Sequence, residues 1–101
     1  MEVFFSDLAE LKLKSLTNYL LEEWSYEVKT EFLAKLTAKI DHISIYPESC
    51  PKTSNYGGIY KCVVTKQTTF FYRVNFVDEE IEIITLFDTR QDPNKIDKHL
   101  D

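Results

Sequence analysis

Residues 59–90 read IYKCVVTKQTTFFYRVNFVDEEIEIITLFDTR and decide the fold. They contain three runs rich in β-branched and aromatic residues, at 59–65, 68–77 and 81–90, which are typical of strands. The connections, Lys66-Gln67 and residues 78–80, have the length and polarity of hairpin turns. The stretch therefore predicts an antiparallel meander of three strands.

The middle run alternates between two kinds of side chain, as expected for a strand with two different faces. One face is apolar and carries Phe70, Tyr72, Val74 and Phe76, while the other is mixed and carries Thr69, Phe71, Arg73 and Asn75. We expect the apolar face, Phe76 included, to pack against the N-terminal half of the chain. The mixed face, with Arg90 just past the last strand, is left for function.

The chain begins with a β-prone segment, residues 2–5, that we interpret as an edge strand. A helix is expected from about Asp7 to Glu22, with Asp7 as its N-terminal cap and Ser6 as the alternative. Its buried face is expected to carry the apolar residues at helical spacing, namely Leu8, Leu11, Leu16, Tyr19 and Leu20.

A second helix is capped by Ser25 and ends before Pro47, because a proline pushes the preceding residue out of the α region. An apolar stripe runs along it through Val28, Phe32, Leu36, Ile40 and Ile43. Residues 47–58 contain two prolines and both glycines and are expected to form a loop, and residues 95–100 a short helical or extended tail. The order β-α-α-β-β-β predicts an α+β fold, with a helical hairpin packed on an antiparallel sheet.

Composition indicates one domain, residues 1–101, with 44% hydrophobic residues to build its core. No apolar run approaches the roughly 18 residues of a membrane span, and no signal-peptide pattern is present, so we expect a cytoplasmic protein that does not contact membranes. The net charge is −5, and only residues 47–77 are net positive. No stable direct nucleic-acid binding is expected of such an acidic chain.

Metal and cofactor sites are not indicated by the sequence. The candidate ligands are His42, His99, Cys50 and Cys62, and their spacing in the sequence does not match that of known zinc sites. The chain has two glycines and no glycine-rich phosphate loop. We therefore expect no cofactor and no metal, and two free thiols in a reducing compartment.

Two arginines could contact a partner. Arg73, in the middle of a strand, either pairs with an acid on a neighbouring strand or faces a ligand. Arg90, after a strand end, is either held locally by Asp88 or Asp92 or binds a partner. The residues themselves leave both alternatives open.

The element order and several short segments resemble the RelE/ParE superfamily of toxins from bacterial type II toxin–antitoxin modules. The segments are ISIYP at 43–47, YKCVV at 60–64, FYRV at 71–74 and FDTRQDP at 87–93. The similarity extends over nearly the whole chain. It implies one of two activities: RelE-like members are ribosome-dependent endoribonucleases that cut mRNA, whereas ParE-like members poison DNA gyrase.

The resemblance places this chain nearer the ParE-like branch. It keeps Lys61 and Arg90 at positions that basic residues occupy in the nucleases. It has Val63, Thr69 and Ile96 at or near the positions of a strand lysine, a strand arginine and a C-terminal tyrosine. RNA cleavage is therefore disfavoured, and whether the protein is an enzyme at all stays uncertain.

The resemblance thus implies a toxin that binds a cellular target, expected to be DNA gyrase, through Lys61, Arg73 and Arg90. A cognate antitoxin is expected to wrap the helical hairpin and sheet and to block this surface. One alternative is a RelE-like mRNA endoribonuclease acting on the ribosome through the same three residues, and another is a degenerate, non-toxic member.

Overall fold

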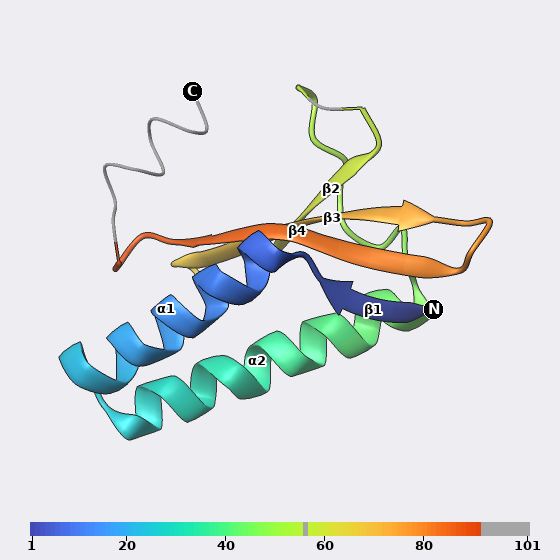
Figure 1. Cartoon of the computed structure of the whole chain (residues 1–101). Coiled ribbons are helices and arrows are strands. Elements are labelled where there is room, and N and C mark those ends of the chain that lie inside the picture. Colours follow the sequence, from blue (N-terminus) through green and yellow to red (C-terminus); the bar gives the residue numbers. More distant parts are fainter. Residues whose placement is uncertain (56, 92–101) are drawn as a thin grey trace.

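The helices and strands are arranged as two layers in the computed structural model, which describes residues 1–55 and 57–91. In chain order they are β1 (Glu2–Phe5), α1 (Asp7–Glu23), α2 (Tyr26–Ile45), β2 (Ile59–Val63), β3 (Thr68–Asn75) and β4 (Glu80–Asp88). The two helices lie side by side beneath one face of the sheet (Figure 1). The predicted α+β fold and element order are confirmed, and the tail expected at 95–100 lies outside the described residues.

The sheet has four strands in the order β1-β4-β3-β2. β2, β3 and β4 form the expected antiparallel meander, and β1 is the expected edge strand. β1 runs parallel to β4, with Val3 opposite Ile81. A parallel neighbour requires a long crossover, and here the chain between the two strands includes both helices and the other two strands. The sheet is therefore mixed at this one edge.

Both helices begin at serine caps. The Ser6 hydroxyl accepts a hydrogen bond from the Ala9 backbone N–H (3.0 Å) and donates one to the Ile84 carbonyl (2.7 Å). Ser25 caps α2 in the same way, as expected, by accepting from Val28 N–H (3.1 Å). The primary expectation that Asp7 caps α1 was wrong. Asp7 is the first helical residue, where its negative charge interacts favourably with the positive N-terminal end of the helix dipole.

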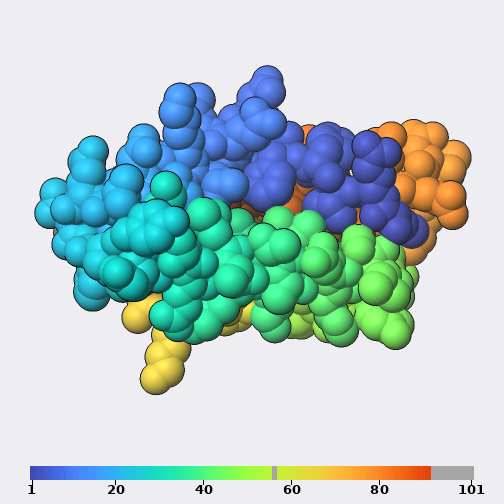
Figure 2. All heavy atoms as spheres, turned by 90° about the horizontal axis from the view of Figure 1, so that it is seen from below, coloured from blue at the N-terminus to red at the C-terminus, as the bar shows by residue number. Residues whose placement is uncertain are grey.

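The buried face of α1 differs from the expected one. Leu8 and Leu11 were expected in the core, but they are 54% and 71% exposed. The other expected residues, Leu16, Tyr19 and Leu20, are buried or packed against the core as predicted. Ala9 and Leu13 take the places of Leu8 and Leu11, so that the face against the sheet has residues spaced by three or four positions. The helices cover most of the sheet in the view from below (Figure 2). The predicted stripe of α2 is confirmed, because all five of its residues are buried or packed against the core.

A β-bulge in β4 decides which of its later side chains face the helices. Phe71 of β3 lies opposite Thr85 and Tyr72 lies opposite Ile83, so Ile84 is an extra residue. The alternation of β4 shifts by one position at this point. Leu86 and Asp88 are consequently buried under the helices, and Phe87 is on the other face.

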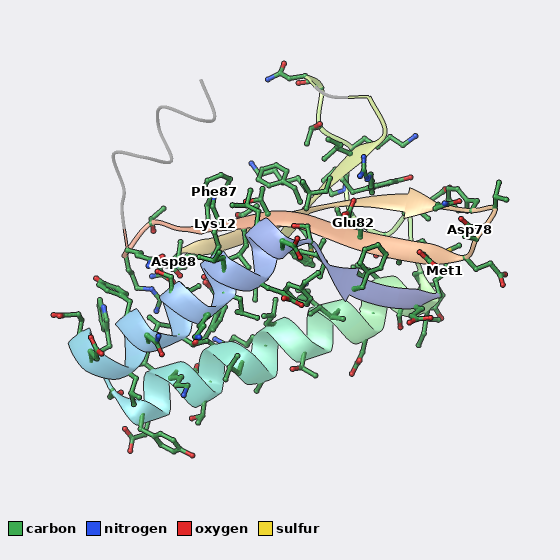
Figure 3. The ribbon with its side chains drawn as sticks, in the orientation of Figure 1. Met1, Lys12, Asp78, Glu82, Phe87 and Asp88 are labelled. Carbon is green, nitrogen blue, oxygen red and sulfur yellow. The ribbon has the colours of Figure 1, made fainter. Side chains whose placement is uncertain are left out.

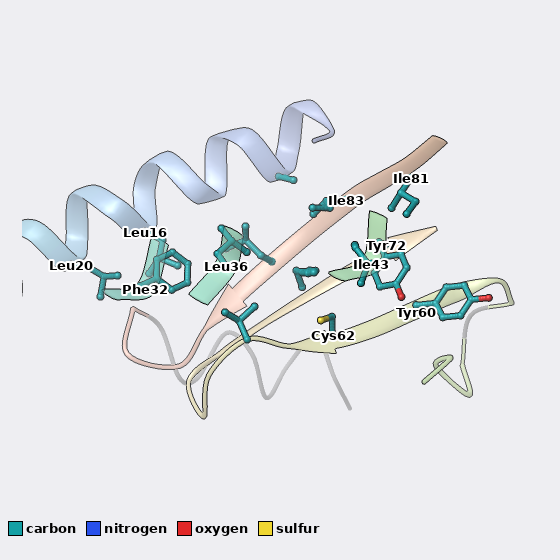
Figure 4. Packing of buried hydrophobic residues seen from close by; sticks show 14 residues of the cluster. Leu16, Leu20, Phe32, Leu36, Ile43, Tyr60, Cys62, Tyr72, Ile81 and Ile83 are labelled. Atoms are coloured by element: carbon teal, nitrogen blue, oxygen red, sulfur yellow. The ribbon is translucent and has the colours of Figure 1, made fainter. Parts of the chain in front are cut away.

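The core lies between the helices and the inner face of the sheet (Figure 4). Tyr72 is fully buried, stacks on Tyr60 with ring centroids 5.0 Å apart, and donates a hydrogen bond to the Pro47 carbonyl (2.8 Å). Phe76 was expected in this core and is 55% exposed. The reason is that β3 ends at Asn75, whose side-chain carbonyl accepts from two backbone N–H groups in the turn and ends the alternation.

Candidate functional site

The sheet surface opposite the helices, which we call the outer face, is the candidate functional site. Among the described residues no helix lies on it (Figure 1). Its side chains alternate with the buried ones along β2, β3 and β4. Two of the three basic residues predicted for function, Lys61 and Arg73, lie here.

Lys61 and Arg73 are neighbours on adjacent strands. Lys61 lies opposite Phe71 in the β2–β3 register, and Arg73 is two residues further along β3 on the same face. Diagonal pairs of this kind are about 7–8 Å apart, within reach of long side chains. The Arg73 guanidinium forms an ion pair with Glu82 on β4 (2.6 Å), while its side chain is 66% exposed. The structural alternative for Arg73 is confirmed, and the group still faces solvent.

Aromatic side chains lie beside this basic pair. Phe71 and Phe87 pack edge to face, with ring centroids 6.1 Å apart. The Lys12 ammonium of α1 reaches to 3.8 Å from the centre of the Phe87 ring, a cation–π contact (Figure 3). The sequence analysis missed Lys12 and Phe87, because the bulge that turns Phe87 outward has no signal in the alternation of β4.

The end of the outer face near the β2–β3 hairpin lacks the basic residues of the nucleases. Val63 lies opposite Thr69, and Thr69 lies opposite Phe87. Val63 is 54% exposed. Two of the three positions at which this chain departs from the RelE-like pattern are thus adjacent, and neither carries a charge; the third, Ile96, lies outside the described residues.

Arg90 is in a different environment, at the far end of β4. Its guanidinium forms two hydrogen bonds to the Asp88 carboxylate (3.1 and 2.7 Å) and lies 5.7 Å from the centre of the Trp24 ring. Its backbone carbonyl accepts a hydrogen bond from the Tyr19 hydroxyl (2.7 Å). The Arg90 side chain is 15% exposed and that of Asp88 is fully buried. Arg90 therefore ties the end of β4 to α1.

The protonation of this pair agrees with a structural role. Burial alone would raise the pKa of Asp88, but hydrogen bonds from Arg90 and Thr68 outweigh burial, and the pKa is lowered below its usual value. The hydrogen bond to Asp88 raises the pKa of Arg90 against the opposing effect of burial. Asp88 stays ionised and Arg90 stays protonated at neutral pH.

The three predicted residues therefore do not form one cluster. Thr68, opposite Asp88, is five residues along β3 from Arg73, or roughly 17 Å at about 3.4 Å per residue. Lys61 and Arg73 are together on the outer face, toward the opposite end of the β3–β4 pair. Of the two alternatives for Arg90, the structure shows local pairing with Asp88, although the run of apolar residues did not reveal that this ion pair is buried.

The described part of the chain contains no cluster of three or more His, Cys, Asp or Glu side chains that could hold a metal ion. Neither of its two helices is long and apolar enough to cross a membrane. The functional groups that the described outer face presents are cationic side chains and aromatic rings.

The fold is shared with known toxins of bacterial toxin–antitoxin systems. A chromosomal ParDE system from P. aeruginosa has a chain that matches with a TM-score of 0.70 and 12% identity, over 87% of this chain and 95% of that one. A YoeB/ParE toxin from Agrobacterium tumefaciens matches with 0.67 and 14%, over 87% and 98%. The E. coli RelBE toxin–antitoxin complex matches with 0.61 and 13%, over 86% and 94%.

Sequence comparison identifies the family. No curated protein matches the chain. The family model described as "ParE toxin of type II toxin-antitoxin system, parDE" matches residues 3–93. The match covers all six helices and strands except the first residue of β1, so the resemblance to the RelE/ParE superfamily is confirmed. The chain belongs to the ParE toxin family of type II toxin–antitoxin systems.

Proposed function

We propose that this ParE-family toxin inhibits bacterial growth by binding DNA gyrase through the outer face of its sheet, and that a cognate antitoxin neutralises it. The observation that carries the proposal is the composition of that face. Lys12, Lys61 and Arg73 surround the Phe71–Phe87 ring pair on a sheet surface that no described helix covers. Aromatic residues and arginine are enriched in protein–protein interfaces.

The arrangement of charges favours binding over RNA cleavage. Cleavage of a phosphodiester needs several donors aimed at one phosphate and its developing charge. Here Arg90 is bound to Asp88, Arg73 is paired with Glu82, and apolar Val63 replaces a lysine. Of the remaining cations, Lys12 lies over the Phe87 ring, so the described residues do not gather several donors around one phosphate-sized position. The RelE-like nuclease is thus the weaker reading, and we keep it as an outcome of the test.

The exposed leucines of α1 support an antitoxin partner. Leu8 and Leu11 have apolar side chains that the fold itself does not bury. Leu11 also lines a groove along α1 with Asn18, Tyr19 and Gln91. An amphipathic segment of a partner binds to such a surface with its apolar side chains in the groove. The similar RelBE structure is a complex of toxin and antitoxin, and we propose the same kind of assembly for this chain.

The gyrase assignment is tested with purified protein in a DNA supercoiling assay. We expect the toxin to inhibit gyrase. Lys61→Glu combined with Arg73→Glu should weaken inhibition about tenfold or more, equivalent to ~1.4 kcal/mol of binding free energy. Lys39→Glu, an exposed change on α2, is the matched control and should leave inhibition unchanged. Full inhibition by the double variant would exclude the outer face as the binding surface.

Growth assays separate the remaining readings. Induced expression should reduce DNA replication before protein synthesis and should induce a DNA-damage response. Early loss of translation, with mRNA cut at ribosome-occupied codons, would instead support the nuclease. Normal growth, together with no inhibition of gyrase supercoiling by the purified protein, would support a degenerate, non-toxic family member.

The antitoxin surface is tested by Leu8→Lys combined with Leu11→Lys. Both side chains are exposed, so the toxin should fold and remain toxic, while co-expression of the cognate antitoxin should no longer restore growth. Rescue equal to that of the wild type would show that the antitoxin does not use this face of α1.

A further inference from the structure

The two cysteines lie opposite each other where the loop after α2 pairs with β2. Lys52 forms an isolated antiparallel bridge with Tyr60. Lys61 N–H donates a hydrogen bond to the Pro51 carbonyl (2.9 Å), and Thr53 N–H donates one to the Ile59 carbonyl (2.7 Å). The loop therefore follows the edge of β2 like a short additional strand.

This register positions Cys50 opposite Cys62. The two hydrogen bonds are on either side of Lys52 and Tyr60, so these two residues form a non-hydrogen-bonded pair. Two positions further along each segment, Cys50 and Cys62 would form the next pair of the same type. Such pairs have Cα atoms about 4.5 Å apart, within the range of about 4.4–6.8 Å that a disulfide requires.

The environment of the two thiols agrees with this register. Cys62 is 1% exposed and faces the core (Figure 4), and Cys50 is partly buried against the same core. Burial, together with a hydrogen-bonding interaction with the Cys50 side chain, raises the pKa of Cys62 to about 12. Burial and the nearby Cys50 also raise the pKa of the Tyr72 hydroxyl. Both thiols thus lie on the inner side of the sheet, close to each other.

We propose that Cys50 and Cys62 are an oxidative modification site, in which a low-molecular-weight disulfide such as oxidised glutathione converts the two thiols into an intramolecular disulfide. The thiolate of Cys50, the more exposed of the two, attacks the glutathione disulfide and releases one glutathione thiolate. The thiolate of Cys62 then attacks Sγ of Cys50 and releases the second. Two protein thiols lose two protons and two electrons, and one glutathione disulfide is reduced to two thiols.

The linkage has a defined structural consequence. It joins the loop to β2 through a closed ring of residues 50–62 and thereby fixes the loop over the outer edge of that strand. Formation is expected to be slow, because little of buried Cys62 is present as the thiolate that performs the second attack. In a reducing cytoplasm such a bond would form during oxidative stress and be reduced afterwards.

The test uses the full-length, fully reduced protein incubated with oxidised glutathione and analysed by mass spectrometry. We expect a monomer lighter by two hydrogens, in which trypsin leaves the peptides 40–52 and 62–66 linked until a reductant is added. A stable glutathione adduct on Cys50, disulfide-linked dimers, or two unmodified thiols would each overturn the proposal.

Two single variants identify the order of attack. Cys62→Ala should accumulate the glutathione adduct on Cys50, and Cys50→Ser should remain unmodified, since its remaining thiol is buried. Circular dichroism verifies that each variant is folded. Cys50→Ser changes only a partly buried loop residue, so it keeps the test valid if Cys62→Ala disturbs the core. Modification of Cys62 in folded Cys50→Ser would contradict the assigned order of attack and overturn the role of Cys50.

Discussion

The two ends of the β3–β4 pair each carry an arginine–carboxylate ion pair, and the two pairs have opposite environments. Arg90 and Asp88 have side chains that are 15% and 0% exposed, with a contact of 2.7 Å. Arg73 and Glu82 have side chains that are 66% and 22% exposed, with a contact of 2.6 Å. Similar contact distances therefore occur in very different dielectric surroundings. Figure 3 labels Asp88 at one end of β4 and Glu82 part-way along the strand toward the other end.

Burial decides what each pair does. At the buried end, neither charge can return to water if its partner is removed, so each group requires the other. At the open end, each charge is already solvated, and the pair adds little to folding. An arginine is available for binding a partner only in the second case. The comparison agrees with a role in folding for Arg90 and leaves Arg73 as the arginine that we propose for recognition.

Among the substitutions in the two ion pairs, Arg90→Ala has the largest expected effect. The substitution leaves the fully buried Asp88 carboxylate without its cation, and loss of one partner of a buried pair costs about 3–5 kcal/mol. Unfolding in urea, followed by circular dichroism, measures the change. An unchanged midpoint would mean that the buried end is not held by this ion pair.

The pH dependence of stability sharpens the same comparison. Because the pKa of Asp88 is lower in the folded state, its contribution is complete above the unfolded value of about 3.9 and is lost as the pH falls through the lowered folded value. In Arg90→Ala, burial without the cation raises the pKa of Asp88, so the stability difference between wild type and variant should already narrow as the pH falls towards about 4 and should narrow further below it. Urea titrations at a series of pH values measure it. A constant difference across the acid range would exclude Asp88 as the group involved.

The sequence predicted the elements well because their signals are local. The cap at Ser25, the stop at Pro47 and the apolar stripe of α2 depend on residues within a few positions of each other. The three strands were likewise readable from β-branched and aromatic runs, although β3 ends two residues earlier than expected. Strand and helix formation in this chain follows local chemistry.

The candidate site was less predictable because it depends on register. The bulge at Ile84 moves Phe87 outward and Asp88 inward, and no pattern in the sequence of β4 predicts this bulge. Burial of Arg90 follows from that shift, because Asp88 must face α1 to hold it. Lys12 reaches the outer face only because α1 packs beside β4. Contacts between distant segments of the chain thus decided the site.

Phe76 tests how far the open end extends. Phe76→Asp was expected from the alternation to unfold the domain, but the side chain is 55% exposed beyond the end of β3. We now expect a loss of stability of about 1 kcal/mol or less, as for other surface positions. Phe70→Asp, at a fully buried position of the same strand, is the matched control and should prevent folding. Thermal melts of both variants distinguish the two positions, and equal destabilisation would contradict the boundary drawn here.

The smallest expected effect on stability is that of Arg73→Ala. Its ion pair with Glu82 is exposed, so the loss should be roughly 0.5 kcal/mol, with 1 kcal/mol as an upper bound. Replacing an arginine that has only a structural role would weaken target binding only to the extent that it destabilises the fold. If Arg73 is a recognition residue, gyrase inhibition by Arg73→Ala should fall by more than the urea midpoint accounts for. For Arg90→Ala, inhibition should instead fall in proportion to the fraction unfolded. The ratio of lost inhibition to lost stability therefore separates the two arginines, and equal ratios would remove the distinction between the two ends of the sheet.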